Sequence, residues 1–549
     1  MIKLLHINPD ERRKISLFFF QNFFEGMGVA FFYTLALAYF LETNPIHNFP
    51  WVFVASGVSI MIFATVYAKF EHHGIPSKLF MGLAWVMIVL LIGCSVVLRS
   101  HLDPLWIGII LMTVYHLIYY LNKTQFWGMS ALTFDVRQSK RLFSVMSVGD
   151  LPAKFIGYTV LAGLLAKGKM TYEQFAYGAI ICYLISMYVL RIILKEEPEL
   201  QMRLGHDEKH HDNHKTKISP IVKGLMVLAV VNVFSVQLID YLYAKEVKHY
   251  FEYEGGTVAS ILTLTMAIFY GIATVLKLFV SGRLLQRVNL KYLIVAMPVI
   301  LMISIFIFWM ITDQSHKHDT YNYFFIVLFG LEVILKETLN KPLTLSLYQP
   351  LSKSQRLDGH TKVKGYFESG GMILMGLFLM NIYRTHEHID LNFSTIVLMI
   401  VMAIWVAVGF GFGRVYLRNL RTLIASKLMR GDRSLFLDPE TANFLRKKLR
   451  SGEELEIINA WDILQKHAAL KEDDLLVMLH HDNSDFRTMA LNFLPKLKMS
   501  KAEKKKIIRS MIEDQRREIR LLSLEKYAEM SEDEEWDDVI SRFEDVDEN

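Results

Sequence analysis

A chain of 549 residues with 52% hydrophobic and 13% aromatic residues is too apolar to form one soluble globule. Its mean hydropathy is +0.28 and its formal net charge is only +5, so the composition indicates a membrane protein and does not favour a partner made of nucleic acid. The two cysteines, Cys94 and Cys182, both lie inside apolar runs, which excludes a disulfide framework and a cysteine-based metal site.

Apolar runs long enough to span a bilayer, about 20 residues each, recur through the first three quarters of the chain. The first run is too long for the apolar core of a signal peptide, so we expect it to be retained. The runs form two sets, at 15–41, 51–70, 79–98, 105–122, 142–166 and 174–194, and at 219–244, 257–281, 290–311, 321–349, 363–383 and 392–417. We therefore predict an all-α, polytopic membrane protein with about twelve transmembrane helices in two six-helix repeats, the major-facilitator arrangement.

A polar linker rich in His, Glu and Asp separates the two sets of runs. We divide the chain into an N-terminal transmembrane half at 1–194, a linker at 195–218, a C-terminal transmembrane half at 219–420 and a further domain at 421–549. The histidines of the linker could hold a transition metal, but nothing there fixes the ligand geometry. A solvated loop is the favoured interpretation, and we expect neither a metal site nor a cofactor.

Lys and Arg residues are concentrated in alternate loops between the runs. One side receives the N-terminal segment, the linker and the segment after the last run, whereas the other side has only scattered cations. By the positive-inside rule, both termini and the linker lie in the cytoplasm.

The fifth run carries charge both at its rim and inside it. Arg137, Lys140 and Arg141 precede the run, and we expect them to line the cytoplasmic rim and to take part in gating. Asp150 and Lys154 lie within the run, four residues apart on one helical face. They could form a self-contained ion pair that holds two helices together, or they could contact a substrate, and both alternatives stay open.

The first run carries a polar face formed by Gln21, Asn22 and Glu25. Asn22 is typical of interhelical hydrogen bonding near the membrane boundary. Glu25 lies deeper, so we favour a role in a cavity or in proton coupling. On the seventh run, Asp240 approaches the outer side, where it lines either the translocation path or only the outer mouth.

The tenth run has the highest density of charge in the second half of the chain. Glu332, Lys336 and Asn340 follow one another at steps of four residues, with Glu337 and Lys341 beside them. Because so many charges are hard to accommodate against lipid, we expect this face to line a water-filled path. The next run adds two further candidate translocation residues, Lys364 and Glu368.

The composition changes after residue 421, where the chain becomes highly charged and shows helical periodicity. Amphipathic segments follow one another in pairs at a period of roughly 35–45 residues, which predicts an α-solenoid of HEAT type. Its expected stacked core comprises Leu475, Leu476, Leu479, Phe486, Met489, Ala490, Phe493 and Leu494.

Three segments carry a resemblance to a known family. FDVRQSKRLF, at 134–143, is similar to the ATP:ADP antiporter, or nucleotide transporter, family. A looser likeness lies between the tenth and eleventh runs, with Pro342, Tyr348 and Lys364, and DNSDFRTMAL, at 482–491, resembles the HEAT consensus. The resemblance implies a major-facilitator-like carrier of the bacterial inner (plasma) membrane that exchanges or imports nucleotides and is fused to HEAT repeats.

The sequence supports three functional hypotheses. The first is a secondary carrier for an anionic solute, a nucleotide such as ATP or ADP or another phosphorylated compound, with the HEAT unit as a regulatory or docking module for a cytoplasmic protein. The second is a proton-coupled carrier of another solute class that uses Glu25. The third is a non-transporting membrane scaffold that recruits a partner through its HEAT surface. No phosphate-binding loop, zinc-protease motif or nucleophile elbow is apparent, so we do not expect an enzyme.

Overall fold

A computed structural model describes residues 12–71, 75–133, 149–168, 170–197, 200, 219–254, 257–281, 284, 288–312, 319–348, 351, 353–385, 391–429, 439–451, 453–466, 469–497 and 499–530. This part of the chain is all-helical, with no strand. The chain divides into two compact units, 1–419 and 420–549, and each unit has its own buried apolar residues.

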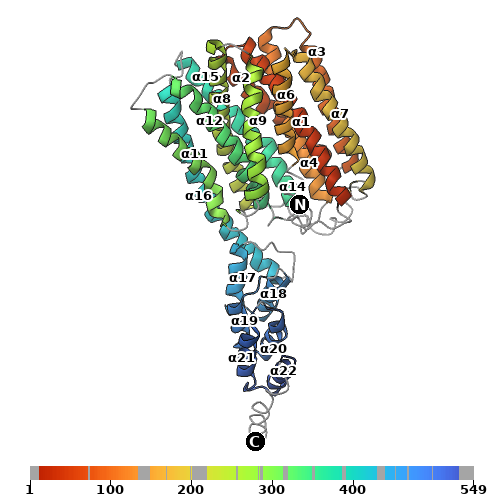
Figure 1. Cartoon of the computed structure of the whole chain (residues 1–549), viewed down its shortest axis with the longest axis vertical. Coiled ribbons are helices and arrows are strands. Elements are labelled where there is room, and N and C mark those ends of the chain that lie inside the picture. The colour runs from red at the N-terminus through yellow and green to blue at the C-terminus, as the bar shows by residue number, and fades with distance from the viewer. Residues whose placement is uncertain are drawn as a thin grey trace, which may run out of the picture. The chain divides into compact units, whose positions relative to one another are not determined.

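The first unit is a bundle of long helices (Figure 1). Its first half comprises α1 (Arg12–Thr43), α2 (Phe49–Glu71), α3 (Pro76–Val97), α4 (Pro104–Thr133), α6 (Asp150–Lys167) and α7 (Tyr172–Glu196). Its second half comprises α8 (Pro220–Glu254), α9 (Val258–Leu276), α11 (Leu290–Thr312), α12 (Asp319–Leu335), α13 (Lys341–Leu347), α14 (Lys353–Lys362), α15 (Ser369–Thr385) and α16 (Leu391–Met429). Within the described ranges, nine helices are long and apolar enough to cross a membrane.

Three of the predicted runs do not form plain apolar helices. The run at 142–166 is described only from its α6 portion, which carries Asp150 and Lys154. The runs at 321–349 and 363–383 contain π-helical segments, at Lys336–Asn340 and Val363–Glu368. That these three also cross the membrane, as the count of about twelve requires, stays a prediction.

Three predicted runs end well before the helices that contain them. α4 continues from the predicted end at 122 to Thr133, α8 from 244 to Glu254, and α16 from 417 to Met429. The first two predicted ends lie directly before a lysine, Lys123 and Lys245. A lysine next to an apolar run is typical of a membrane boundary, but Lys123 pairs with a carboxylate inside the bundle.

Large apolar side chains cover much of the outer surface of the first unit. Trp51, Trp85, Val96 and Phe279 are each more than half exposed. An exposed apolar surface of this extent is typical of a protein surrounded by lipid. Together with the nine long apolar helices of the described ranges, it identifies this unit as a multi-pass membrane domain.

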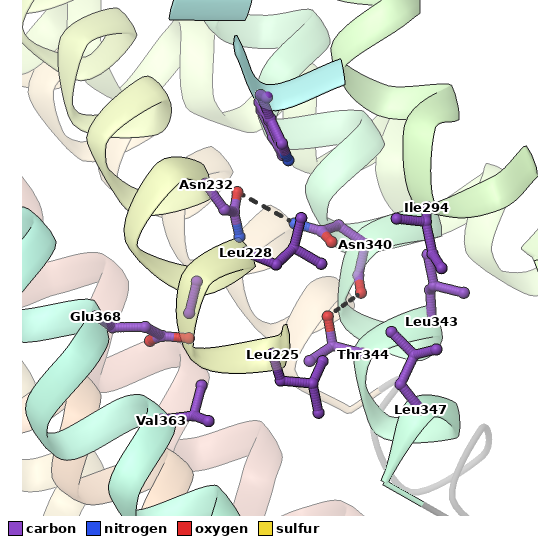
Figure 2. A pocket seen from close by; sticks show the side chains of 12 residues that line it. Leu225, Leu228, Asn232, Ile294, Asn340, Leu343, Thr344, Leu347, Val363 and Glu368 are labelled. Atoms are coloured by element: carbon purple, nitrogen blue, oxygen red, sulfur yellow. Dashed lines mark hydrogen bonds between the residues drawn. The ribbon is translucent and has the colours of Figure 1, made fainter. Parts of the chain in front are cut away.

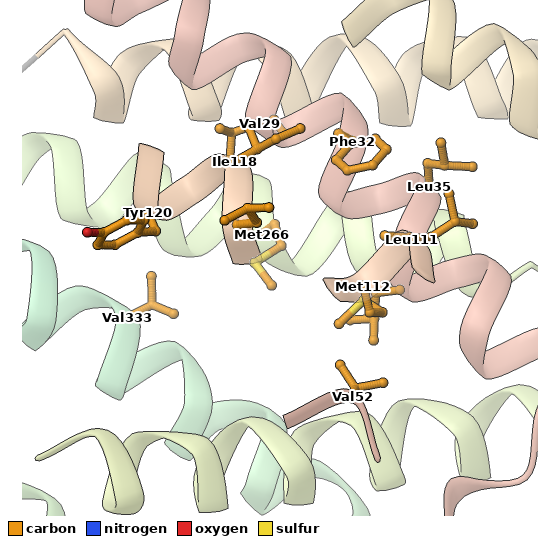
Figure 3. Packing of buried hydrophobic residues seen from close by; sticks show 14 of the residues in the cluster. Val29, Phe32, Leu35, Val52, Leu111, Met112, Ile118, Tyr120, Met266 and Val333 are labelled. Carbon is orange, nitrogen blue, oxygen red and sulfur yellow. The ribbon is translucent and has the colours of Figure 1, made fainter. Parts of the chain in front are cut away.

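The two halves of the first unit pack closely along α2 and α15. A Cβ atom added to Gly57 would lie 2.6 Å from Ile373, and one added to Gly376 would lie 2.7 Å from Val54. Glycine is therefore required on both helices for their backbones to approach. Figure 3 shows the buried apolar cluster between the halves, where residues of α1 and α4 meet Met266 of α9 and Val333 of α12.

The second unit is a row of six short helices, α17 (Pro439–Ser451), α18 (Glu454–Lys466), α19 (Glu472–Leu479), α20 (Ser484–Phe493), α21 (Lys501–Met511) and α22 (Arg517–Ala528). Consecutive helices pack against each other in pairs. The predicted core is confirmed for Leu475, Leu479, Phe486, Ala490 and Leu494, which are buried, whereas Leu476, Met489 and Phe493 are half-buried. The alternation of short amphipathic helices and tight turns explains this pairing, because each helix has one apolar face to cover.

Candidate functional site

Three lysines converge on one tyrosine ring inside the membrane unit. The ammonium groups of Lys123, Lys154 and Lys341 lie 5.6, 5.4 and 5.4 Å from the centre of the Tyr119 ring. Tyr119 and Lys123 belong to α4, Lys154 to α6 and Lys341 to the start of α13. Cations at this distance are attracted by the ring quadrupole. The two halves of the bundle therefore both contribute to this group, which together with its carboxylate partners Asp150 and Glu337 we name the central cluster.

Asp150 joins two of these lysines. Lys123 Nζ donates to Asp150 Oδ2 at 2.8 Å, and Lys154 Nζ lies 3.2 Å from Asp150 Oδ1. The side chain of Lys154 is only 2% exposed. The ion pair predicted between Asp150 and Lys154 is thus present but not self-contained, because α4 supplies a second cation to the same carboxylate.

The second half supplies two ion pairs from one helical stretch. Glu337 pairs with Lys341, and Glu332 pairs with Lys336 across 3.3 Å. Residues five apart on a regular α-helix point about 140° away from each other. The segment Lys336–Asn340 is π-helical, and the N–H of Lys341 bonds the carbonyl of Lys336 five residues earlier, so the wider turn brings these two lysines closer to one face.

Pro342 gives a physical reason for the π-helical segment. Proline lacks an N–H group, and its ring clashes with the carbonyl four residues earlier, here that of Thr338. The hydrogen-bond ladder shifts register directly before it, at Lys336–Asn340. π-Helical turns are frequent at functional sites. The proline by itself predicts a loosened helix at this point, but not the change of register.

Asn340 faces a different environment from its neighbour Lys341. Its side chain donates to Asn232 Oδ1 on α8 at 3.4 Å and lines a pocket whose wall also includes Glu368 and Thr344 (Figure 2). The remaining walls are mainly leucines, valine and Trp405. Of the predicted translocation residues, Asn340 and Glu368 line this pocket, and Asp150 and Lys154 belong to the central cluster.

Glu25 is buried with neutral partners. It is 3% exposed, and its Oε1 accepts hydrogen bonds from Gln21 Nε2 at 3.0 Å and Ser186 Oγ at 3.2 Å. Within the described residues it forms no ion pair. Next to it, a Cβ atom on Gly26 would lie 2.8 Å from Asp150 Oδ1, so α1 and α6 touch at this level. Glu25 is thus one residue from the contact between α1 and the central cluster.

The other predicted site residues lie on α8, on α1 and in the segment before α15. Asp240, on α8, lies within electrostatic range of Lys336 and Glu332. Asn22 is buried on α1, and Lys364 is half-buried in the π-helical segment that ends at Glu368. The rim residues Arg137, Lys140 and Arg141, the histidine-rich linker and the segment 134–143 all lie outside the described residues.

Sequence reasoning missed two members of the central cluster, Tyr119 and Lys123. A usable signal existed, because the two are four residues apart and so share a helical face. Lys123 follows the predicted end of its run, so the apolar pattern does not place it inside the bundle. Among the residues that the structure describes, no group of His, Cys, Asp and Glu side chains is arranged to hold a metal ion.

No family model matches the chain, and no curated protein matches it. Among solved structures, a bacterial homologue of the iron transporter ferroportin in the outward-facing state matches with a TM-score of 0.51 and 11% identity, over 74% of this chain and 98% of that one. A mutant of the nucleoside transporter NupG matches with a TM-score of 0.49 and 10% identity, over 73% of this chain and 99% of that one. A POT family transporter in complex with a thioalcohol-conjugated peptide matches with a TM-score of 0.48 and 12% identity, over 74% of this chain and 96% of that one.

The likeness to the ferroportin homologue establishes the fold of the membrane unit. It agrees with the predicted all-α, multi-pass membrane architecture, whereas the major-facilitator arrangement of two six-helix repeats stays a prediction. At about a tenth identity, the likeness does not extend to the substrate.

Proposed function

We propose that this chain is a secondary transporter that moves an anionic solute across the membrane by alternating access. The observation that carries the proposal is the convergence of Lys123, Lys154 and Lys341 on the ring of Tyr119. These charges lie deep in an apolar bundle, where an ionised side chain is costly unless it is paired or functional. Their position between the two halves supports a binding role, because a solute held there contacts both halves at once.

The charge balance of the central cluster favours an anion. Its three lysines face two carboxylates, Asp150 and Glu337, which leaves one ammonium group in excess. In the absence of solute the carboxylates pair with the lysines and limit the penalty of burying them. An arriving phosphate or carboxylate group competes with Asp150 and Glu337 for the same ammonium groups. Exchange of these partners offers a way to couple binding to movement of the halves.

The finer parts of the proposal concern the solute and the topology. We propose a nucleotide or another phosphorylated compound, on the strength of the resemblance at 134–143 and the excess of ammonium groups. We further propose about twelve transmembrane helices in two six-helix repeats, in the bacterial inner membrane, with both termini in the cytoplasm.

For the second unit we propose a HEAT-type solenoid that regulates transport or docks a cytoplasmic protein. Two arginines link successive helix pairs. Arg446 of α17 bonds Asp474 of α19 at 3.0 Å, and Arg487 of α20 bonds Asp514, which follows α21, at 3.3 Å. Such repeated ties between neighbouring helix pairs are typical of stacked repeats.

A second candidate function is favoured by Glu25. A buried carboxyl group with only neutral hydrogen-bond partners can take up and release a proton without breaking an ion pair. The helix that carries Glu25 contacts Asp150 through Gly26, so protonation of Glu25 would change the electrostatic potential at the central cluster. In this alternative, the protein is a proton-coupled carrier of another solute class.

Uptake into proteoliposomes separates these functions. Purified protein is tested with labelled ATP, ADP and inorganic phosphate, with and without a pH gradient. Counter-exchange that needs no gradient supports the anion exchanger. Uptake that is driven by the gradient and disappears in Glu25→Gln supports the proton-coupled carrier. The absence of transport of every tested solute would remove the anion proposal, and together with a stable partner pulled down by residues 430–549 it would favour the scaffold.

A further inference from the structure

Two helix ends in the membrane unit have backbone groups that their own helices do not satisfy. At the C-terminal end of α1, the carbonyl of Leu41 would normally accept from the N–H four residues later, which belongs to Pro45 and is missing. At the start of α9, the N–H of Val258 is one of the first-turn donors, which likewise have no partner within the helix. Both groups are buried, since Leu41 and Val258 are 0% exposed.

Each of these groups is satisfied by a charged side chain from the other half. Lys248 of α8 donates to the Leu41 carbonyl at 2.9 Å and to the Asn44 carbonyl at 2.7 Å. In return, Glu42 of α1 accepts from the Val258 N–H at 3.0 Å through Oε1. Its other oxygen accepts from the hydroxyl of Tyr172 at the start of α7.

The charges also suit the helix ends that they meet. A cation is stabilised at the negative C-terminal end of a helix, and an anion at the positive N-terminal end. Lys248 meets the C-terminal end of α1, and Glu42 meets the N-terminal end of α9. The contact is therefore reciprocal, with one charged side chain from each half bound to a helix end of the other half.

We propose that Glu42 and Lys248 form a latch that closes the membrane unit at the α1 C-terminal end, and that the latch opens when the unit exposes its centre on that side. When the unit opens at this end, water can replace Lys248 and Glu42 as the hydrogen-bond partners of the two helix ends. Both residues act as positioning residues, because they hold the halves and do not belong to the central cluster.

Thiol labelling tests the latch without any substrate, so its result does not depend on the proposed solute. Ala244 lies one turn before Lys248 on the same face of α8 and is 1% exposed. In a background where Cys94 and Cys182 are replaced by alanine, Ala244→Cys supplies a single reporter. A membrane-impermeant maleimide is then applied from the side of the α1 C-terminus, to protein whose monodispersity is checked by size-exclusion chromatography.

We expect Lys248→Met to increase the labelling rate by about tenfold or more, since losing charged hydrogen bonds shifts a two-state equilibrium by at least that order. Lys248→Arg, which keeps the charge and the donors, should restore slow labelling. Lys167→Met is the matched control, because Lys167 is an exposed cation at the end of α6. Its rate should equal that of the parent.

A second variant keeps the test decisive if Lys248→Met does not fold. Glu42→Gln preserves the size of the side chain and an acceptor oxygen but removes the charge at the start of α9, and it should also accelerate labelling. Equal labelling rates in the parent and in the folded latch variants would overturn the proposal. Fast labelling in the absence of measurable transport would support the latch and count against the proposed function alone.

Discussion

The ion pairs of the membrane unit differ from those of the second unit in the ratio of cations to carboxylate partners. In the central cluster, Asp150 is shared by two lysines, and a third lysine approaches the same tyrosine ring. In the second unit, Arg446 bonds the carboxylate of Asp474 and the carbonyl of Ala469. Arg446 therefore has a carboxylate and a carbonyl that it does not share with another cation, whereas Lys123 and Lys154 share the single carboxylate of Asp150. The first arrangement is suited to receiving an anion, and the second to holding helices together.

The sharpest way to break this comparison is to remove Lys154. Lys154→Met retains most of the length of the side chain and leaves Asp150 with Lys123 alone. We expect kcat/KM for anion transport to fall by at least about 100-fold, because the variant loses a buried cation of the proposed solute site. Lys167→Met on the same helix is the control and should transport normally. Parental transport in a folded Lys154→Met protein would exclude α6 from the site.

Removal of Lys336 tests the pair that the sequence indicated. Lys336→Ala leaves Glu332, which is 0% exposed, without its cation. We expect transport to be abolished while the protein stays monodisperse, as measured by proteoliposome uptake and size-exclusion chromatography. Wild-type rates in this variant would remove the stretch of α12 and its π-helical segment from the translocation path.

Neutralising Glu337 should strengthen the binding of the anion, whereas removing a lysine should weaken it. Glu337→Gln frees Lys341 from its carboxylate partner, so the anion meets less competition. We expect the Kd for the transported anion to decrease by about 3- to 30-fold, in line with the usual strength of a charged hydrogen bond. Turnover should slow, because the solute is released less readily. A weaker affinity measured by ligand titration would show that the carboxylate does not compete with the solute.

The smallest transport effect is expected at Glu25. Glu25→Gln can keep its contacts with Gln21 and Ser186, so gradient-independent exchange should stay within about twofold of the parent. Only gradient-driven uptake should disappear, if a proton is carried there. An equal loss of both activities would assign Glu25 to solute binding.

In the second unit, removing an arginine that forms an ion pair should lower the unfolding free energy of that unit without changing the rate of transport. Arg487→Ala deletes the bonds to Asp514 and to the carbonyl of His481 at 2.7 Å. We expect the unfolding free energy of a 420–549 fragment to decrease by about 1–3 kcal/mol, because buried acceptors lose a charged partner. Lys526→Ala, whose partner Glu529 is half exposed, should have a smaller effect in the same thermal unfolding experiment.

Much of the architecture could be predicted from the chain alone. Helix length and apolar run length are linked by the thickness of a bilayer, so α1, α2 and α3 begin and end within a few residues of the predicted runs. The same rule misplaced the end of α4. A run that stops at a lysine indicates a boundary only when the lysine reaches water, and Lys123 instead pairs with Asp150.

The sequence by itself indicated several of the buried charges, although not Lys123, since a Glu, Asp or Lys within an apolar run is visible at its position. It also showed the pairs that lie one turn apart, such as Asp150 with Lys154 and Glu332 with Lys336, because helical periodicity places them together. Only the tertiary structure decided that three helices bring their lysines to Tyr119, and that the helix changes to π-helical register over Lys336–Asn340, directly before Lys341. The physical reason is that contacts between distant segments depend on helix packing and register, which no local spacing encodes.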